Sequence, residues 1–299
     1  MPELPEVETV VSDLRGAIPG RRILRVWCNT PRIISGTSPA SLSRALRGLY
    51  INVIDRRGKN ILFYLGARGA PTLSHVLLIH LKMTGHLLLG RWKIKKTPRG
   101  ETVESMPSGP LAEKVNSYIR MVLYLEGGIE LGLSDARKFA KVALFLASEL
   151  RHTAHLRTLG PDVYTELTKR EFYARLQKIY RPIKQALLDQ TIFAGLGNIY
   201  TDEVLYAARI HPLRRASSLI PQEASLLFRA VRRIIKKAIR LRGASMSDFR
   251  DPQGERGRYA DHRLVYRRTG ELCGRCDTLI RRIVIHGRSA HFCPECQRP

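Results

Sequence analysis

A cluster of four cysteines near the C-terminal end constrains the fold more than any other feature of this chain. Cys273 and Cys276 form one Cys-x2-Cys pair, and Cys293 and Cys296 form a second pair after sixteen intervening residues. Two such pairs converge readily on one tetrahedral ion and leave no open position for water, which indicates a closed structural zinc site. Because so short a segment cannot bury enough apolar surface to fold alone, we expect one structural Zn²⁺ to contribute to its stability.

The residues between the two cysteine pairs are expected to form a hairpin. Two strands over Leu279–Phe292, with a turn at 286–289, would place Arg288 at the hairpin tip. The fifth cysteine, Cys28, lies in the apolar run 23–28 and is expected to be a buried core thiol.

The charge of the chain indicates a polyanionic partner. The net charge is +25 at pH 7 over 299 residues, and hydrophobic residues make up 44%, so this is a folded protein and not a solvated tail. Nucleic acid is therefore the first partner to consider, with an alkaline surface that has no partner as the alternative. A basic face on the predicted helix at 222–242 either binds the polyanion or is simply solvated; its cations are Arg232, Arg233, Lys236, Lys237 and Arg240.

The sequence gives no indication of a membrane. No stretch reaches the roughly 18 uninterrupted apolar residues of a transmembrane helix. Lys and Arg are spread along the chain, and Glu3, Glu6 and Glu8 stand where a signal peptide would need a basic region and an apolar core. We therefore expect a cytoplasmic, nucleoid-associated protein with no membrane partner.

The second and third residues form an unusual chemical pair. Removal of Met1 is favoured by a small following side chain and would leave Pro2 at the start of the mature chain. Its secondary amine would have a pKa near the roughly 7.7–8.0 of α-amino groups, so part of it is unprotonated at neutral pH. Such an amine can attack an electrophilic carbon and form an iminium ion, with Glu3 as the adjacent acid or base. An ordinary start without a chemical role is the alternative.

The spacing of apolar residues predicts an α+β fold whose N-terminal part is a β-sandwich flanked by helices. A helix is expected directly after Pro5, and Gly127-Gly128 is expected to close a hairpin. Residues 91–114, which contain several Pro and Gly, are expected to form an extended loop. The predicted strands are 23–27, 51–55, 61–65, 76–80, 121–125 and 129–133.

Beyond Leu159-Gly160-Pro161 the pattern becomes helical, which indicates a domain boundary. Helices are predicted at 170–180, 183–190, 199–208 and 222–242. The expected organisation is a catalytic sandwich domain at 1–150, a linker at 151–162, a helical DNA-binding domain at 163–262 and a zinc hairpin at 263–299.

Short motifs elsewhere are ambiguous when taken singly. Lys59, after a glycine, is either a turn cation or a phosphate ligand. Met83 and Phe139 are either core residues or exposed wedges that enter a duplex, and Arg137 and Lys138 flank the phenylalanine. Asn198, at the end of Gly195–Asn198, is either a helix N-cap in a tight turn or part of a phosphate cradle.

Taken together and in this order, the motifs resemble the formamidopyrimidine-DNA glycosylase family of base-excision repair enzymes. The likeness runs from Pro2–Thr9 through 57–59, 80–85, 135–139, 195–200 and 210–212 to the terminal zinc hairpin. The chain has Leu4 instead of a glycine at this position, which resembles the purine-lesion branch and not the related endonuclease VIII branch. The resemblance implies a monomeric bifunctional glycosylase and AP lyase with a helix-two-turn-helix domain. Such an enzyme would remove 8-oxoguanine and formamidopyrimidines from damaged double-stranded DNA and cleave the strand by β,δ-elimination.

The resemblance also implies roles for single residues. Pro2 would attack C1′ of the damaged nucleotide and Glu3 would be the acid, while Lys59 and Arg288 would assist the two eliminations. The lesion pocket would include Glu6 and Tyr259, with residues 248–261 as a loop that closes over the extruded base. The implied DNA contacts are Met83, Tyr118, Arg137, Lys138, Phe139, Lys184 and Asn198.

Some positions depart from the family pattern and leave alternatives open. Tyr118 and Arg120 replace frequent histidines, Ala140 and Asp277 replace glycines, and the 91–114 segment looks long. The predicted catalytic residues are intact, but the substrate preference is not determined. The alternatives are endonuclease VIII-like excision of oxidised pyrimidines, a non-catalytic DNA-binding zinc protein of the same fold, and an RNA-binding basic protein.

Overall fold

The computed structural model describes residues 1–69, 72–97, 100–105 and 109–299, which form two compact units. The N-terminal unit comprises Met1–Arg157 and Leu241–Arg258, and the C-terminal unit comprises Thr158–Arg240 and Tyr259–Pro299. Residues 241–258 thus return to the N-terminal unit, whereas the sequence pattern assigns them to the helical domain at 163–262. No helix in the described ranges combines the length and apolar character needed to cross a membrane.

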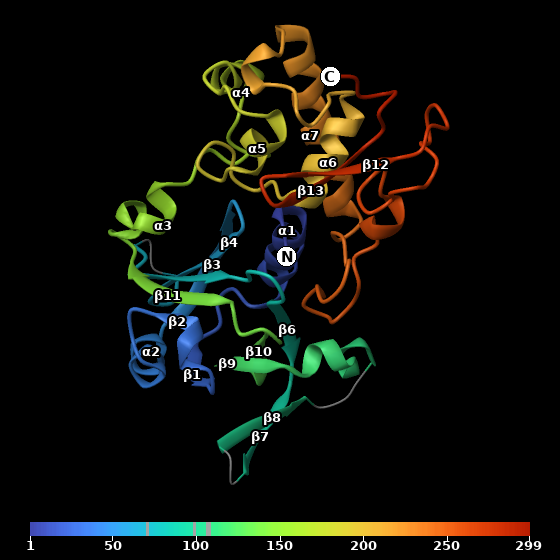
Figure 1. Cartoon of the computed structure of the whole chain (residues 1–299). Helices are drawn as coiled ribbons and strands as arrows, with labels where there is room; N and C mark the ends of the chain where they lie inside the picture. The colour runs from blue at the N-terminus through green and yellow to red at the C-terminus, as the bar shows by residue number, and fades with distance from the viewer. Residues whose placement is uncertain (70–71, 98–99, 106–108) are drawn as a thin grey trace. The chain divides into compact units, whose positions relative to one another are not determined.

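The sandwich of the N-terminal unit consists of two sheets (Figure 1). The antiparallel sheet β1-β9-β10-β6 consists of β1 (Ile23–Cys28), β6 (His86–Gly90), β9 (Ile119–Leu125) and β10 (Ile129–Ser134). The sheet β2-β11-β5-β4-β3 consists of β2 (Ile34–Ser35), β3 (Tyr50–Arg57), β4 (Asn60–Gly66), β5 (His75–His80) and β11 (Lys141–Leu146). One hydrophobic core draws on both sheets, for example on Leu123 and Phe63, which confirms the predicted sandwich.

The expected strands are all present, and β2, β6, β7, β8 and β11 are additional. Gly127 and Gly128 close the β9–β10 hairpin with φ of 82° and 72°, a left-handed conformation that glycine adopts without strain. β6 ends the first sheet, and its outer edge is covered because the Leu89 N–H donates to the Pro252 carbonyl at 2.7 Å.

Helix α1 (Leu4–Ala17) begins where the sequence predicts a helix. Pro5 lies in its first turn, where the missing N–H costs nothing. The buried face carries Val7, Val10, Val11 and Leu14 at helical spacing, and these side chains join the sandwich core. The N-terminal end of the chain is thereby held against β3 and β4.

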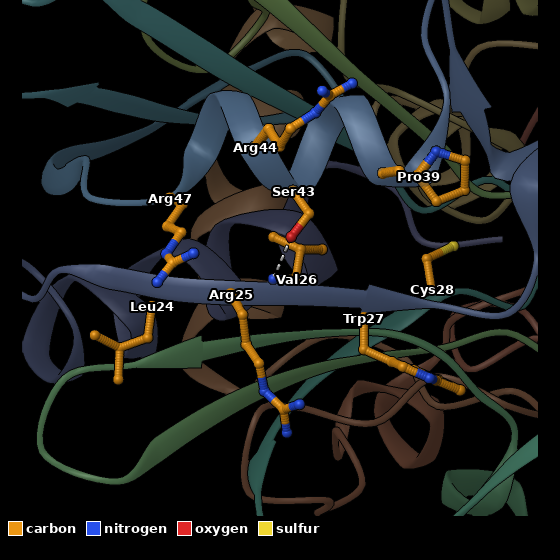
Figure 2. Close-up of a pocket in the computed structure, with 10 residues that line it drawn as sticks. Leu24, Arg25, Val26, Trp27, Cys28, Pro39, Ser43, Arg44 and Arg47 are labelled. Carbon is orange, nitrogen blue, oxygen red and sulfur yellow. Dashed lines mark hydrogen bonds between the residues drawn. The ribbon is translucent and has the colours of Figure 1, made fainter. Parts of the chain in front are cut away.

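A second helix, α2 (Pro39–Leu46), packs against β1, the other edge strand of the first sheet. Figure 2 shows the cleft between them, where the Val26 N–H donates to Ser43 Oγ at 3.1 Å. Cys28 lines this cleft and is half-buried, but it packs against the sandwich core, so the prediction of a buried core thiol was correct only in part. Burial still raises the pKa of its thiol.

Residues 91–114 are not an extended loop. The strands β7 (Trp92–Thr97) and β8 (Gly100–Ser105) pair antiparallel, and short 3₁₀ turns follow at Gly109–Ala112 and Lys114–Ser117. The Trp92 N–H donates to Glu130 Oε2 at 2.7 Å, and its indole packs with Leu88, Ile119 and Val122. Residues 98–99 and 106–108 lie outside the described ranges. Residues 92–105 thus form a β-hairpin, and Glu130 of β10, which is distant in sequence, holds its first residue, Trp92.

The C-terminal unit is helical and ends in the predicted hairpin (Figure 1). Its helices are α4 (Lys169–Leu176), α5 (Ile183–Leu188), α6 (Asn198–Ala207) and α7 (Pro221–Arg240), and its strands are β12 (Arg281–Ile285) and β13 (Arg288–Phe292). The short helix α3 (Ala154–Arg157) precedes it in the chain and belongs to the N-terminal unit. The turn of the hairpin is His286-Gly287, so Arg288 is the first residue of β13, exposed beside the tip.

Candidate functional site

The predicted nucleophile and acid lie at the start of α1. Pro2 is buried, and Glu3 is the N-cap residue of the helix with only 2% exposure. The Glu3 N–H donates to Glu6 Oε2 at 2.8 Å, which satisfies a donor that the first helical turn would otherwise leave unpaired. The backbone next to Pro2 is therefore held in one conformation.

Lys59 lies in the turn between β3 and β4, directly after Gly58, whose φ is 58°. The Arg56 guanidinium holds this turn, because Nη1 donates to the Gly58 carbonyl at 2.8 Å and Nε donates to Glu8 Oε2 at 2.7 Å. Glu8 belongs to α1, so one buried arginine connects the lysine turn to the helix that carries Pro2 and Glu3. Lys59 itself is buried.

Met83, Arg137 and Phe139 are brought together by Asp135. The two oxygens of this buried carboxylate accept the Phe139 N–H at 2.6 Å, the Ala140 N–H at 2.7 Å and the Thr84 hydroxyl. Thr84 Oγ1 in turn accepts the Arg137 N–H at 3.2 Å. The two predicted wedge segments are thus joined through hydrogen bonds below their exposed tips.

The tips themselves face solvent. Met83 is 39% exposed and Phe139 is 43% exposed. Single exposed apolar side chains are common on protein surfaces, but these two belong to segments that the Asp135 hydrogen bonds hold together. The Arg137 guanidinium lies 4.6 Å above the Phe139 ring centroid. Lys138 is exposed with φ of 57°, and Tyr118, half-buried, lies under the Arg120 guanidinium at 5.8 Å.

Glu6 contacts residues 241–258 in addition to the start of α1. Its Oε1 accepts the Ala244 N–H at 2.6 Å. Arg242 binds Asp13 of α1 and also donates from Nε to Asp251 Oδ2 at 2.7 Å. These contacts explain why the segment packs with the N-terminal unit. In this structure the buried Glu6 carboxylate is engaged by backbone, and its predicted place in a lesion pocket stays a prediction.

In the C-terminal unit, Asn198 is the first residue of α6 and Gly197 is the N-cap, so the N-cap interpretation of Asn198 was wrong. The backbone at Gly197 is extended, and Asn198 Oδ1 is a buried oxygen without a hydrogen-bond partner in the described residues. A polar side chain left in this state at a helix N-terminus is suited to receive a ligand.

Lys184 lies inside the C-terminal unit and is 0% exposed. Its ammonium forms an ion pair with Asp202 and donates to the Ser289 carbonyl at 2.6 Å. Asp202 also accepts the His291 N–H at 2.9 Å. Lys184 therefore does not offer a surface cation to DNA here; it joins α5 and α6 to β13, beside Arg288.

Tyr259 is buried as well, and its hydroxyl donates to Glu203 Oε2 at 3.1 Å. The same carboxylate accepts the backbone N–H groups of Leu264, Val265 and Tyr266 at 2.8–3.0 Å. Burial raises the pKa of Glu203 although these donors lower it. Asp202 and Glu203 were missed in the sequence; adjacent acids within an otherwise apolar helix were the available signal.

Family models match almost the whole chain. The formamidopyrimidine-DNA glycosylase N-terminal domain matches residues 1–142, the H2TH domain of the same family matches 159–250, and the zinc finger found in FPG and IleRS matches 270–299. The chain belongs to the formamidopyrimidine-DNA glycosylase family. Members of this family are DNA glycosylases and AP lyases, so the chain is a base-excision DNA repair enzyme.

Relatives and solved structures agree over the full length. The formamidopyrimidine-DNA glycosylase of Symbiobacterium thermophilum is 40% identical over 99% of this chain and 89% of the relative, and that of Listeria innocua is 35% identical over 100% of both. Lactococcus lactis Fpg in complex with abasic-site DNA superimposes with a TM-score of 0.82 at 33% identity, covering 100% of both chains. MutM in complex with DNA containing carbocyclic 8-oxo-G gives 0.83 at 33% identity, again over 100% of both.

The family's zinc finger has a matching donor set in this chain. The four cysteine Sγ atoms lie within 4.8 Å of one another, with Cys276 Sγ 3.4 Å from both Cys293 Sγ and Cys296 Sγ, and Cys273 Sγ 3.9 Å from Cys296 Sγ. Four thiolates placed tetrahedrally about 2.3 Å from zinc are separated by roughly 3.8 Å. The cysteines therefore fit one structural Zn²⁺, as the sequence predicts.

Proposed function

We propose that this glycosylase excises oxidised purines, 8-oxoguanine and formamidopyrimidines, from double-stranded DNA through Pro2 and then cleaves the strand. The observation that carries the proposal is the Pro2-Glu3 pair at the start of α1, where the Glu3 N–H is held by Glu6 at 2.8 Å. A fixed backbone limits the positions available to both reacting groups, which favours attack in one orientation.

In the proposed reaction, removal of Met1 frees the Pro2 amine. Its nitrogen bonds to C1′ while the bond from C1′ to the base breaks, and the base leaves with that electron pair and takes up the proton that the amine loses. Glu3 protonates O4′ as the sugar ring opens to the iminium ion. Loss of a C2′ proton then expels the 3′ phosphate, and a second elimination expels the 5′ phosphate. Water then hydrolyses the remaining iminium, which releases the sugar fragment as an unsaturated aldehyde and restores the Pro2 amine. The products are a free base, this aldehyde and a one-nucleotide gap.

Lys59 is proposed to act at the phosphate and in proton transfer during β-elimination, with Arg288 in the same role for δ-elimination. The turn geometry supports the first assignment, since Arg56 keeps the Lys59 turn against α1. Lys184 supports the second indirectly, because its ammonium holds the Ser289 carbonyl next to Arg288. Lys184 would thus influence DNA contacts through the hairpin.

Binding of the damaged duplex is proposed to use the exposed tips described above. Met83, Arg137 and Phe139 would fill the space left by the extruded nucleotide, which offsets an unstacking cost of about a few kcal/mol. Tyr118 and Lys138 would contact the strands nearby, and Asn198 at the start of α6 would hold a phosphate. Glu6 and Tyr259 remain the proposed lesion-pocket residues, and the enzyme is proposed to act as a monomer on nucleoid DNA.

Borohydride trapping tests the chemistry. Mass-checked protein that lacks Met1 is incubated with an 8-oxoguanine duplex, and borohydride reduces any iminium to a stable adduct. We expect an adduct from the wild type, altered chemistry with Pro2→Gly and a reduced yield with Glu3→Gln. An oxidised-pyrimidine duplex serves as the competing substrate, and preferential trapping there would move the assignment to the endonuclease VIII-like activity. No adduct with either lesion would leave a DNA-binding protein without catalysis.

A further inference from the structure

A basic hollow lies in the C-terminal unit between the end of α6 and the outer face of α7. Its volume is about 620 Å³, and its lining residues are Ala207, Ala208, Arg209, Leu226, Arg229, Ala230 and Arg233. Helix α7 buries Leu227, Val231 and Ile234 on one face. Residues 226, 229, 230 and 233 follow helical spacing of three and four, so they line up along the side of the helix at the hollow.

Every charged residue that lines the hollow is an arginine, and no acidic residue of the described part of the chain forms an ion pair with Arg209, Arg229 or Arg233. Two other arginines of this unit form ion pairs with acidic residues. Arg214 pairs with Glu223 and Arg181 with Asp189. Three cations that share one depression repel one another, so an anion placed among them gains from all three.

The positive charge continues along the helix beyond the hollow. Lys236 and Arg240 are exposed and continue the line of Arg229 and Arg233 at spacings of three and four residues. With a rise of about 1.5 Å per residue, the row from Arg229 to Arg240 is roughly 16 Å long. That length matches the axial rise of about five nucleotides in one DNA strand. A repeating polyanion fits the row better than one small anion.

The row is separate from the proposed phosphate contact at Asn198. Asn198 begins α6, whereas the hollow lies where α6 ends, at Ala207. Nine residues of helix place these points roughly 14 Å apart. We infer that Arg209, Arg229, Arg233, Lys236 and Arg240 form a second DNA surface, which binds the phosphate backbone of undamaged duplex without reading the lesion. This inference goes beyond the proposed function and rests on it in one respect, namely that the polyanion is DNA.

Salt dependence of binding to undamaged duplex tests the surface. The variant Arg209→Gln/Arg229→Gln/Arg233→Gln removes three charges from the hollow, and Lys169→Gln/Arg170→Gln/Lys178→Gln removes three exposed charges from the region of α4. Each lost phosphate contact lowers the slope of log K against log salt by about 0.9. For the hollow variant we expect this slope to become shallower by about 2–3, and the affinity at 0.1 M salt to fall on the order of tenfold or more. The control should keep the wild-type slope.

Single-turnover excision at saturating enzyme separates this inference from the proposed function. The hollow variant should excise at the wild-type rate once bound, because none of its three changed arginines belongs to the proposed reacting residues. If the wild type forms no adduct, the proposed chemistry fails while the slope comparison still decides the surface. Equal slopes for all three proteins, or equal losses in both variants, would overturn the inference. So would a hollow variant that loses binding to polyglutamate but not to DNA, since the surface would then fit an acidic protein.

Discussion

The Glu6 carboxylate joins Glu3 to Ala244: Oε2 accepts the Glu3 N–H at 2.8 Å and Oε1 accepts the Ala244 N–H at 2.6 Å. A single buried side chain therefore connects the start of α1 with residues 241–258. Gly243 allows the approach, because its φ is +78° and an added Cβ would lie 2.6 Å from Glu6 Oε1. The position of Ala244, just before the predicted loop at 248–261, is thus coupled to the backbone beside Pro2.

Glu6→Gln is expected to weaken this coupling. An amide offers only one acceptor oxygen, so one of the two N–H groups loses its partner at a cost of about 1–3 kcal/mol. We expect single-turnover excision to slow by about tenfold, and limited proteolysis to cut residues 241–258 faster. Glu126→Gln, which changes an exposed acid, is the control. Unchanged protease resistance in the Glu6 variant would contradict the proposed coupling.

Asp135→Asn is expected to disorder both wedge segments. The amide nitrogen would face N–H donors that the carboxylate now accepts, among them those of Phe139 and Ala140. We expect urea unfolding to show a loss of about 2–4 kcal/mol, together with weaker binding to lesion duplex. Phe139→Ala is the matched comparison, since it removes an exposed ring and should lower duplex affinity without a comparable loss of stability. Equal stability of Asp135→Asn and wild type would refute this role.

Zinc removal should unfold the terminal hairpin. Cys276→Ala leaves three thiolates, and we expect metal analysis to show less than one zinc per chain, with a lower melting temperature for the C-terminal unit. Strand cleavage should then stop at the β-elimination product more often than in wild type, because Arg288 loses its support. Cys28→Ser removes the one cysteine outside the cluster and should keep full zinc content. If Cys276→Ala retains a full zinc equivalent, the four-thiolate assignment fails.

Sequence patterns predicted the elements whose signals are local. Helix α1, the Gly127-Gly128 turn and the two cysteine pairs depend on residues within a few positions of one another, and spacing alone indicates them. The roles of Lys59 and Arg288 beside Pro2 were assigned from the family resemblance, since no spacing rule relates these three residues.

Sequence patterns could not predict which side chains are buried or which distant residues pair. The resemblance implies that Lys184 is a DNA contact, yet its partners are Asp202, on the next helix, and Ser289, 105 positions away. Residues 241–258 were assigned to the helical domain because the preceding helix continues to Arg240, whereas contacts with distant residues such as Glu6, Asp13 and Leu89 decide where the segment packs. The β7–β8 hairpin likewise depends on Glu130, which accepts the Trp92 N–H from another strand.

His86 gives a final prediction about pH. Its imidazole is buried, with Nδ1 3.1 Å from the Thr84 carbonyl and Nε2 2.9 Å from Asn116 Oδ1. These oxygens favour a charged ring, but burial, the largest cause, and the nearby Arg250 outweigh them and lower the pKa to about 4. The folded protein therefore keeps His86 neutral where the unfolded chain, with a histidine pKa of about 6.5, already binds a proton.

The sign of the effect follows from proton binding. Between pH 6.5 and 4 the unfolded state binds more protons, so stability rises with pH; the contribution is complete above about 6.5 and is lost as pH falls towards 4. The shift corresponds to roughly 3 kcal/mol across that window. His86→Gln cannot titrate there, so its free energy of unfolding should fall less between pH 6.5 and 4.5 than that of the wild type. With His75→Gln, at a strand end of the same unit, as the control substitution, parallel curves for all three proteins would rule out a neutral, buried His86.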